Sequence, residues 1–178
     1  MQAVVPVLYQ PAISDNRAMA EIGTCELRLA RRGDAALLAR MSRDYIEQGL
    51  SWRWQASALN EKISAAESVV LVADLELASM RFVGGFAVMD FPCDKAQLNL
   101  LAVHPNLRRH GIGNKLMRWL HKSARIAAVE HIELQVRADN LQARRFYHQL
   151  GYQEETLLPN YYDGKLAAYQ MKLRLYNG

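Results

Sequence analysis

The sequence predicts a single α+β domain that is built on a mixed, mostly antiparallel sheet. Two pairs of apolar runs, residues 68–75 with 81–91 and residues 152–158 with 166–175, have the short connections of antiparallel hairpins. Between the pairs, residues 97–103 form a nearly continuous apolar run, which is typical of a strand that is covered on both faces. A glycine-containing turn and an amphipathic helix follow that run, so we expect helices to pack on the sheet.

Length and composition place the chain among globular proteins. Its 178 residues suit one domain, and 51% apolar with 22% charged residues is ordinary for such a domain. No apolar run approaches the roughly twenty residues of a membrane span. The first residues lack the basic region and the long apolar region of a signal peptide. We therefore expect a cytoplasmic protein with no membrane partner.

Charge and cysteine usage argue against two further kinds of partner. The net charge is +4, but the positive residues are spread along the chain and form no aromatic-basic recognition module, so we expect no nucleic-acid partner. Cys25 and Cys93 lack metal-ligand or redox spacing, and we interpret them as unpaired thiols in a reducing compartment. We expect no bound metal.

The N-terminal third is expected to add one strand and two helices to the sheet. Residues 1–22 have no clear period and are interpreted as an extended arm, which makes residues 23–178 the domain. Residues 25–30 alternate apolar and charged side chains, like a strand with one buried face. An apolar stripe predicts a helix after residue 34, and a second helix is expected over residues 55–66.

Two pairs of residues interrupt the regular pattern of this half. Trp52 and Trp54 stand in the loop between the two helices, where large aromatic side chains usually anchor helices on a core. Gly84 and Gly85 lie inside the second strand of the hairpin. Glycines there predict a bulge or a close approach of another backbone.

The turn after residues 97–103 has the composition of an anion-binding loop. Its two glycines leave backbone N–H groups unshielded at the start of a helix, and its two arginines add positive charge for phosphates. The sequence of the loop is Arg108-Arg109-His110-Gly111-Ile112-Gly113. It lacks the Gly-Lys-Ser/Thr of a Walker loop and the three glycines of a dinucleotide fingerprint, so an ordinary turn stays open as the alternative.

The helix that begins near Gly111 is expected to bury one face. Apolar and small side chains recur there at helical spacing, namely Ile112, Leu116, Trp119, Leu120, Ser123, Ile126 and Ala127. After it, residues 131–137 alternate as a strand, with Ile132, Leu134 and Val136 on one face and Glu133, Gln135 and Arg137 on the other.

A short helix is expected from Asn140 to Gln149. Asn140 can cap its start, and Gly151 sits where a left-handed residue is wanted after its end. Phe146 and Tyr147 are adjacent and point about a quarter-turn apart. One of them can therefore enter the core while the other turns toward a cleft.

These motifs together resemble the GNAT superfamily of acetyl-CoA-dependent N-acetyltransferases. Residues 108–113 fit its Arg/Gln-x-x-Gly-x-Gly/Ala pyrophosphate loop, and residues 100–103 are similar to its fourth strand. Residues 134–140, continued by Ala143, Phe146-Tyr147 and Leu150-Gly151-Tyr152, resemble its second motif. The tail, Asn160-Tyr161-Tyr162 and Ala168-Tyr169-Gln170-Met171, is most similar to the RimI-type N-terminal acetyltransferases.

The resemblance implies six or seven strands, helices on both faces of the sheet, and a V-shaped opening between strands 97–103 and 131–137. It implies acetyl-CoA as co-substrate, with the loop on the pyrophosphate and the main chain of the strand on the thioester and pantetheine. Asn140 would contact the cofactor near its pantetheine arm, in addition to capping its helix. The implied cofactor-binding residues are Leu101, Ala102, Val103, Arg108, Arg109, His110, Gly111, Ile112, Gly113, Asn114 and Asn140.

The resemblance also implies catalytic residues, with one departure. Tyr147 occupies the position of the family's acid, since a phenol can donate a proton to the departing thiolate, and packing under the helix is its alternative. RimI-type enzymes carry a glutamate where this chain has Gln135, and histone-type members carry one at the place of Gln97. Glutamine does not titrate, although it can hold a relaying water. Glu133, on the strand face of Gln135, is the substitute candidate, and a solvated surface glutamate is its alternative.

The missing base bears on the acceptor. An α-amino group has a pKa near 8 and is roughly a tenth neutral at pH 7, whereas a lysine side chain is neutral to less than about one part in a thousand. Together with the resemblance to RimI-type enzymes, this leads us to expect direct acetylation of a protein N-terminus in a ternary complex. The resemblance implies that the loop with Trp52 and Trp54 walls the acceptor groove, and we expect Tyr161 and Tyr162 to bind the acceptor with it. A small-molecule amine, a lysine side chain, a non-catalytic acyl-CoA-binding module and a homodimer stay open.

Overall fold

A computed structural model describes residues 22–77 and 80–175 of the chain. Seven strands and four α-helices make up these residues, with two short 3-10 turns. The strands are β1 (Ile22–Leu29), β2 (Ser68–Leu77), β3 (Met80–Asp90), β4 (Lys95–Val103), β5 (His131–Arg137), β6 (Gln153–Tyr162) and β7 (Leu166–Arg174). The helices are α2 (Ala35–Tyr45), α3 (Ala56–Ser64), α4 (Ile112–Ile126) and α5 (Leu141–Gln149), and the 3-10 turns are η1 (Arg32–Asp34) and η2 (Pro105–Leu107).

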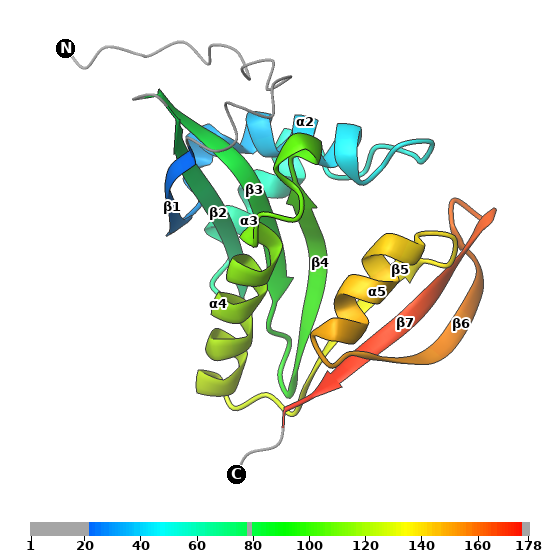
Figure 1. The fold of residues 1–178 in the computed structure, drawn as a ribbon. Helices are drawn as coiled ribbons and strands as arrows, with labels where there is room; N and C mark the ends of the chain where they lie inside the picture. Colours follow the sequence, from blue (N-terminus) through cyan, green and yellow to red (C-terminus); the bar gives the residue numbers. More distant parts are fainter. Residues whose placement is uncertain (1–21, 78–79, 176–178) are drawn as a thin grey trace.

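The strands form one sheet in the order β1-β2-β3-β4-β5-β7-β6 (Figure 1). Among the described residues, every neighbouring pair is antiparallel except β4 and β5, which run parallel. The predicted mixed, mostly antiparallel sheet is thus confirmed. The arm expected over residues 1–22 lies outside the described residues, except for Ile22, which opens β1.

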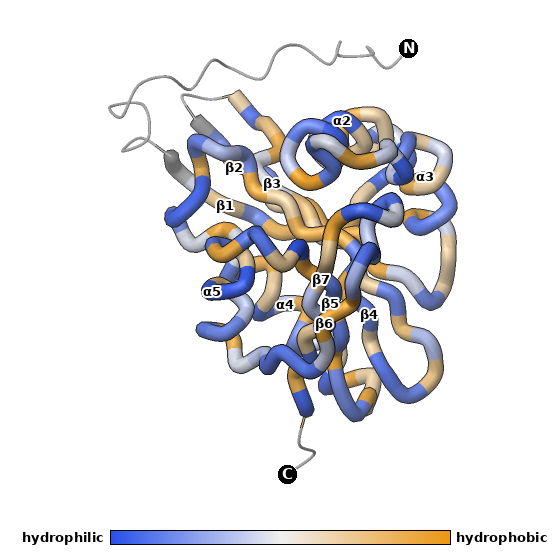
Figure 2. Tube along the Cα trace, turned by 90° about the vertical axis from the view of Figure 1, so that its right-hand side faces the viewer, coloured by the Kyte–Doolittle hydropathy of each residue, from blue (hydrophilic) through white to orange (hydrophobic). Residues whose placement is uncertain are grey.

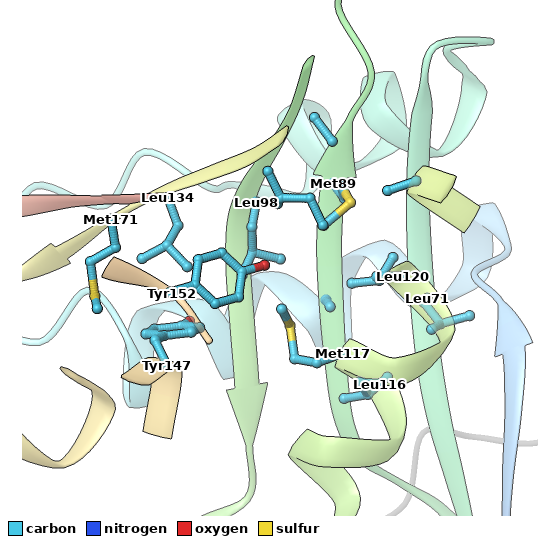
Figure 3. Close-up of a cluster of buried hydrophobic side chains, with 14 of the residues drawn as sticks. Leu71, Met89, Leu98, Leu116, Met117, Leu120, Leu134, Tyr147, Tyr152 and Met171 are labelled. Carbon is cyan, nitrogen blue, oxygen red and sulfur yellow. The ribbon is translucent and has the colours of Figure 1, made fainter. Parts of the chain in front are cut away.

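Helices cover both faces of the sheet, as predicted. The core on one face joins α4 and α5 to the strands, and the core on the other face joins α2 and α3 to β2, β3 and β4 (Figure 2). Figure 3 shows the first core, where Leu116, Met117 and Leu120 of α4 lie against Leu71 and Met89 of the sheet. In the part of the chain that the structure describes, no helix is long and apolar enough to cross a membrane.

The buried face of α4 is rotated from the predicted one. Met117 and Ala124 are fully buried, whereas Trp119 is 36% exposed and Ile126 is 77% exposed. The prediction was therefore wrong for Trp119 and Ile126, and also for Ala127, which is exposed just after the helix. Leu116 and Leu120 lie at the centre of the apolar stripe, and residues on either side of them compete for the core. Packing favours the slender Met117 and Ala124 over the wide indole of Trp119.

Two β-bulges set which side chains reach which face. The pairing of β2 with β3 shifts at Gly84, and that of β3 with β4 shifts at Asn99. Because an extra residue reverses the alternation, Ala96 and Leu98 pack in the α4 core, whereas Leu100 and Ala102 pack in the α2 core. The predicted bulge or close approach at the glycine pair is confirmed, since a Cβ on Gly85 would lie 2.8 Å from the carbonyl oxygen of Ala102.

The sheet splits between its two parallel strands. Residues 95–98 of β4 pair with residues 131–134 of β5, and beyond that point the strands have no further pairing with each other. In Figure 1 the two strands diverge, so that β5, β7 and β6 form a second arm of the sheet. This is the V-shaped opening that the sequence led us to expect. At its far side β6 runs on through Tyr162, so residues 160–162 are strand and not the predicted connection.

Candidate active site

The split between β4 and β5 opens a cleft of about 1270 Å³. Its walls come from the end of β4, the start of α4, one face of α5, the loop after α2, and the end of β6. Most of the side chains singled out in the sequence meet here from five separate elements. Within the residues that the structure describes, no group of three His, Cys, Asp or Glu side chains is placed to hold a metal ion.

The loop between β4 and α4 forms a cationic wall of the cleft. Arg108, Arg109, Gly111, Gly113 and Asn114 line it beside Leu101, Ala102 and Val103 of β4. Arg109 and Gly111 have φ values of 67° and 79°, in the left-handed region. Successive turns of this kind bring backbone N–H groups to one concave side, an arrangement that binds anions. A Cβ on Gly111 would meet nothing within 4 Å.

Two predicted loop residues point elsewhere. His110 does not line the cleft, and its Nδ1 lies 2.9 Å from the carbonyl oxygen of Arg108. Ile112 is buried in the core between α4 and the sheet. The structure therefore does not bring these two side chains to the other predicted cofactor residues.

Helix α5 forms the wall that faces the loop. Asn140 lines the cleft and caps α5, because its Oδ1 accepts a hydrogen bond from the N–H of Ala143 at 3.1 Å. Phe146 is the member of the pair Phe146 and Tyr147 that lies at helical spacing with Gln142, Arg145 and Gln149, and these three lining residues were not assigned from the sequence although their spacing marks one helical face. Phe146 also explains the second loop glycine, since a Cβ on Gly113 would lie 3.3 Å from its ring.

Tyr147 enters the cleft from the core side of α5. It is 8% exposed, its ring packs against Tyr152 and Phe146, and Figure 3 shows it below Leu134 and Met171. Burial raises the pKa of Tyr147 far above its usual value, so the phenol keeps its proton at neutral pH. No hydrogen bond joins this hydroxyl to another residue in the described part of the chain. Its proton is therefore available to a ligand in the cleft.

The candidate base positions differ in where they lie. Gln135 lines the cleft, and its Oε1 accepts a hydrogen bond from Nε2 of Gln97 at 3.0 Å. Glu133 does not line the cleft, so the structure does not bring this candidate base to the other predicted site residues, and at 7% exposed it is not the solvated surface glutamate that was its alternative. Its carboxylate binds Lys95 at 3.0 Å and Lys172 at 3.1 Å. Burial opposes ionisation, but the two ammonium groups prevail and lower the pKa of Glu133.

The loop after α2 and the end of β6 form the wall opposite the cofactor loop. Trp54, Tyr161 and Tyr162 line it, as expected of acceptor residues. Trp52 does not, because it lies outside under the guanidinium of Arg43, 5.5 Å from its ring centre, and is 38% exposed. Among the described residues, the carboxylates that line the cleft are those of Glu47 and Asp163.

Comparisons with known proteins agree with this geometry. The chain matches the model of the Acetyltransferase (GNAT) family over residues 37–152. It is 32% identical over 132 residues to the [ribosomal protein bS18]-alanine N-acetyltransferase of Escherichia coli (strain K12), a match that covers 72% of this chain and 86% of the relative.

Solved structures have the same fold. The ribosomal-protein-S18-alanine N-acetyltransferase from Escherichia coli superposes with a TM-score of 0.73 at 23% identity, over 87% of this chain and 96% of that one. Arabidopsis thaliana NAA60 in complex with acetyl-CoA superposes with a TM-score of 0.73 at 18% identity, over 87% of this chain and 100% of that one.

Proposed function

The chain belongs to the Acetyltransferase (GNAT) family, and from that premise we propose that it acetylates the α-amino group of a protein N-terminus. As a member of the family it is an N-acetyltransferase, and acetyl-CoA is its co-substrate. The finer assignment, the identity of the amine, rests on which groups line the cleft.

The cofactor is assigned to the side of the cleft between β4, the loop 108–114 and α5. The left-handed backbone at Arg109 and Gly111 supports the loop as the pyrophosphate site, and the exposed guanidinium groups of Arg108 and Arg109 add charge for it. Beyond Leu98, β4 has no β5 partner, so its free N–H groups supply donors for the thioester carbonyl. Asn140 lines the cleft from the start of α5, and we assign it to the pantetheine arm.

In the reaction, the amine nitrogen attacks the thioester carbonyl carbon, and its electron pair forms the new C–N bond. The carbonyl oxygen then carries the negative charge, which the N–H groups of β4 stabilise. When this intermediate collapses, the C–S bond breaks and the sulfur leaves with the electron pair. Tyr147 protonates that thiolate, and the proton of the amine passes to water in the cleft. Support for this role comes from geometry: Tyr147 lines the cleft, and its hydroxyl has no hydrogen-bond partner among the described residues. Burial raises the pKa of the phenol, so it carries its proton at neutral pH.

The observation that carries the choice of amine is the state of the two carboxylates in the cleft. Glu47 accepts hydrogen bonds from the N–H of Arg53 and from Ser42, and Asp163 accepts one from the N–H of Ser51. Both carboxylates are hydrogen-bonded to the loop after α2, so neither is a free base. A cleft without a free base suits an amine that is partly neutral, which an α-amino group is and a lysine side chain is not. The printed name of the Escherichia coli relative, an alanine N-acetyltransferase of a ribosomal protein, supports the same class.

Release of free coenzyme A from acetyl-CoA, measured against an acceptor panel, tests the proposal. The panel pairs each peptide having a free N-terminus and no lysine with the same peptide blocked at its N-terminus and carrying one internal lysine. We expect turnover with the first set and at most a few per cent of that rate with the second. Faster acetylation of the lysine peptides, or of simple amines only, would overturn the N-terminal assignment. Binding of acetyl-CoA without turnover of any acceptor would favour a non-catalytic module.

A further inference from the structure

Two glutamine amides are locked to each other at the point where the sheet splits. The Nε2 group of Gln97 donates one hydrogen bond to the carbonyl oxygen of Leu98 at 3.4 Å and another to Oε1 of Gln135 at 3.0 Å. Both N–H bonds of Gln97 are thereby engaged, which fixes the orientation of its amide. Gln135 consequently turns its carbonyl oxygen toward Gln97.

The main chain of Gln135 is held as firmly as its side chain. The hydroxyl of Tyr162 donates a hydrogen bond to the carbonyl oxygen of Gln135 at 3.2 Å. On its other edge, β5 pairs Gln135 with Gln170 of β7. Gln135 is also the first residue of β5 beyond the pairing with β4, so it stands at the inner end of the cleft that it lines. Its side chain is thus a fixed part of the site.

This orientation decides which polar group Gln135 offers to the cleft. Its amide oxygen is used by Gln97, and its Nε2 group has no hydrogen-bond partner among the residues that the structure describes. Two N–H bonds remain, which donate and do not accept. Such a group neither takes a proton from an ammonium ion nor attracts one. Its complement is an oxygen acceptor, and a carbonyl oxygen fits that description.

On the basis of the proposed function, we infer that Gln135 is a specificity-determining residue that donates a hydrogen bond to the carbonyl oxygen nearest the attacking amine. Every N-terminal residue of a peptide carries that carbonyl one carbon away from its amine. A simple amine lacks it, and so does a lysine side chain. An acceptor without the carbonyl leaves a partly buried donor unpaired, and sites built around a hydrogen bond reject such analogues. The substrate class is thus α-amino carbonyl compounds, and Gln97 acts as the positioning residue for Gln135.

A matched pair of small acceptors tests the inference with the full chain. Alaninamide has the carbonyl beside its amine, and propargylamine has an amine of similarly low basicity and no carbonyl. We expect Gln135→Leu to lower kcat/KM for alaninamide about tenfold or more, the usual effect of one lost hydrogen bond to a substrate, and to change it less than about twofold for propargylamine. The KM for acetyl-CoA should stay constant.

Three further variants separate recognition from general damage. Gln170→Leu changes the cross-strand neighbour on the same sheet face, which does not line the cleft, and should leave both acceptors unaffected. Gln97→Leu should lower alaninamide turnover selectively but less, and adding it to Gln135→Leu should cost little more, since the two act as one unit. Gln135→Met removes the N–H donors at nearly the same size and adds no titrating group, so it serves if the leucine variant fails to fold.

The outcomes distinguish this inference from the proposed function. Equal losses for alaninamide and propargylamine in Gln135→Leu or Gln135→Met, or no loss for either, would overturn the role of Gln135 and leave the N-terminal assignment standing. A wild-type enzyme that acetylates propargylamine but neither alaninamide nor N-terminal peptides would overturn the proposed function itself.

Discussion

Ser51 and Asp163 lie 112 residues apart in the chain, and the backbone N–H of Ser51 donates a hydrogen bond of 2.6 Å to Oδ2 of Asp163. That bond lowers the pKa of Asp163 from its usual value. Arg53 approaches the other oxygen of the same carboxylate at 3.4 Å. The loop after α2 and the turn between β6 and β7 are thereby tied together at the acceptor side of the cleft. One carboxylate thus holds together the two segments that form this wall.

Loss of that tie should weaken acceptor binding alone. In Asp163→Ala the loop that carries Trp54 is no longer held to the end of β6, so we expect the KM for an N-terminal peptide to rise about tenfold while the KM for acetyl-CoA stays constant. Asp163→Asn keeps an oxygen for the N–H of Ser51 and should lose less. Steady-state kinetics with each substrate varied in turn measure both effects. Equal changes in the two KM values would mean that the carboxylate only stabilises the fold.

Charge at Gly111 should decide cofactor affinity. Asp and Asn both tolerate the left-handed backbone found there and have nearly the same size, so Gly111→Asp and Gly111→Asn differ only in charge. A carboxylate beside a pyrophosphate should weaken acetyl-CoA binding by about tenfold or more relative to the amide. Calorimetric titration of both folded variants measures the difference. Equal affinities would place the phosphates elsewhere.

Removal of the Tyr147 hydroxyl should slow chemistry and leave binding intact. Tyr147→Phe keeps the ring that packs on Tyr152, and the hydroxyl it deletes has no hydrogen bond in the described part of the chain, so the fold should hold. Loss of a positioned acid should lower kcat on the order of 10²-fold. Thermal melts and acetyl-CoA affinity serve as controls. A thiolate leaving group better than that of coenzyme A should restore part of the rate, which mere disturbance of packing would not allow.

The pH dependence of kcat/KM should be set by the pKa of the acceptor amine and not by a titrating group of the enzyme. No free carboxylate lines the cleft among the described residues, so kcat/KM should rise about tenfold per pH unit and level off near the pKa of the acceptor amine, about 8. Tyr147 adds no falling limb until well above pH 10, because burial raises its pKa. Two peptides whose α-amines differ in pKa should give profiles displaced by that difference. Profiles with a common midpoint would reveal a titrating group of the protein.

Stability should fall on mild acidification because of His121. Burial, aided by Arg125, lowers the pKa of His121 to about 4, and its Nε2 lies 3.0 Å from the hydroxyl of Tyr152. Between its ordinary value of 6.5 and about 4, the unfolded chain binds a proton that the folded protein rejects, so stability decreases as pH falls through that range. His121→Gln keeps a hydrogen-bonding group and should flatten the dependence of Tm on pH from 7.5 to 5. An unchanged slope would assign the effect to other groups.

Local patterns in the sequence predicted the elements of the fold, but not the bulge at Asn99. The pair Gly84 and Gly85 predicts a bulge from the sequence alone, since glycine is rare inside strands. No residue type near Asn99 indicates a bulge, because the bulge there arises from how β3 and β4 pair. In the sequence, residues 97–103 therefore read as one continuous buried strand. In the structure, the bulge divides it between two cores.

Site residues that belong to one local motif could be predicted from the sequence. Residues whose surroundings depend on contacts between distant strands or on the path of a loop could not. Glu133 alternates with the apolar residues Ile132 and Leu134 and shares its strand face with polar ones, so a surface position was one interpretation of it. Its two partners come from neighbouring strands, since Lys95 lies on β4 and Lys172 is its cross-strand partner on β7. From the sequence, Trp52 and Trp54 were both expected to bind the acceptor. Only Trp54 lines the cleft, a difference that depends on the path of an irregular loop.

The split of the sheet has a consequence for amide hydrogen exchange. Those N–H groups of residues 99–103 that point away from β3 face the opening without a strand partner. In the free protein their deuterium uptake should resemble that of an edge strand, although they lie at the centre of the molecule. We expect a pantetheine chain in the opening to accept their hydrogen bonds and slow the uptake, so that these few central amides would report cofactor occupancy one residue at a time.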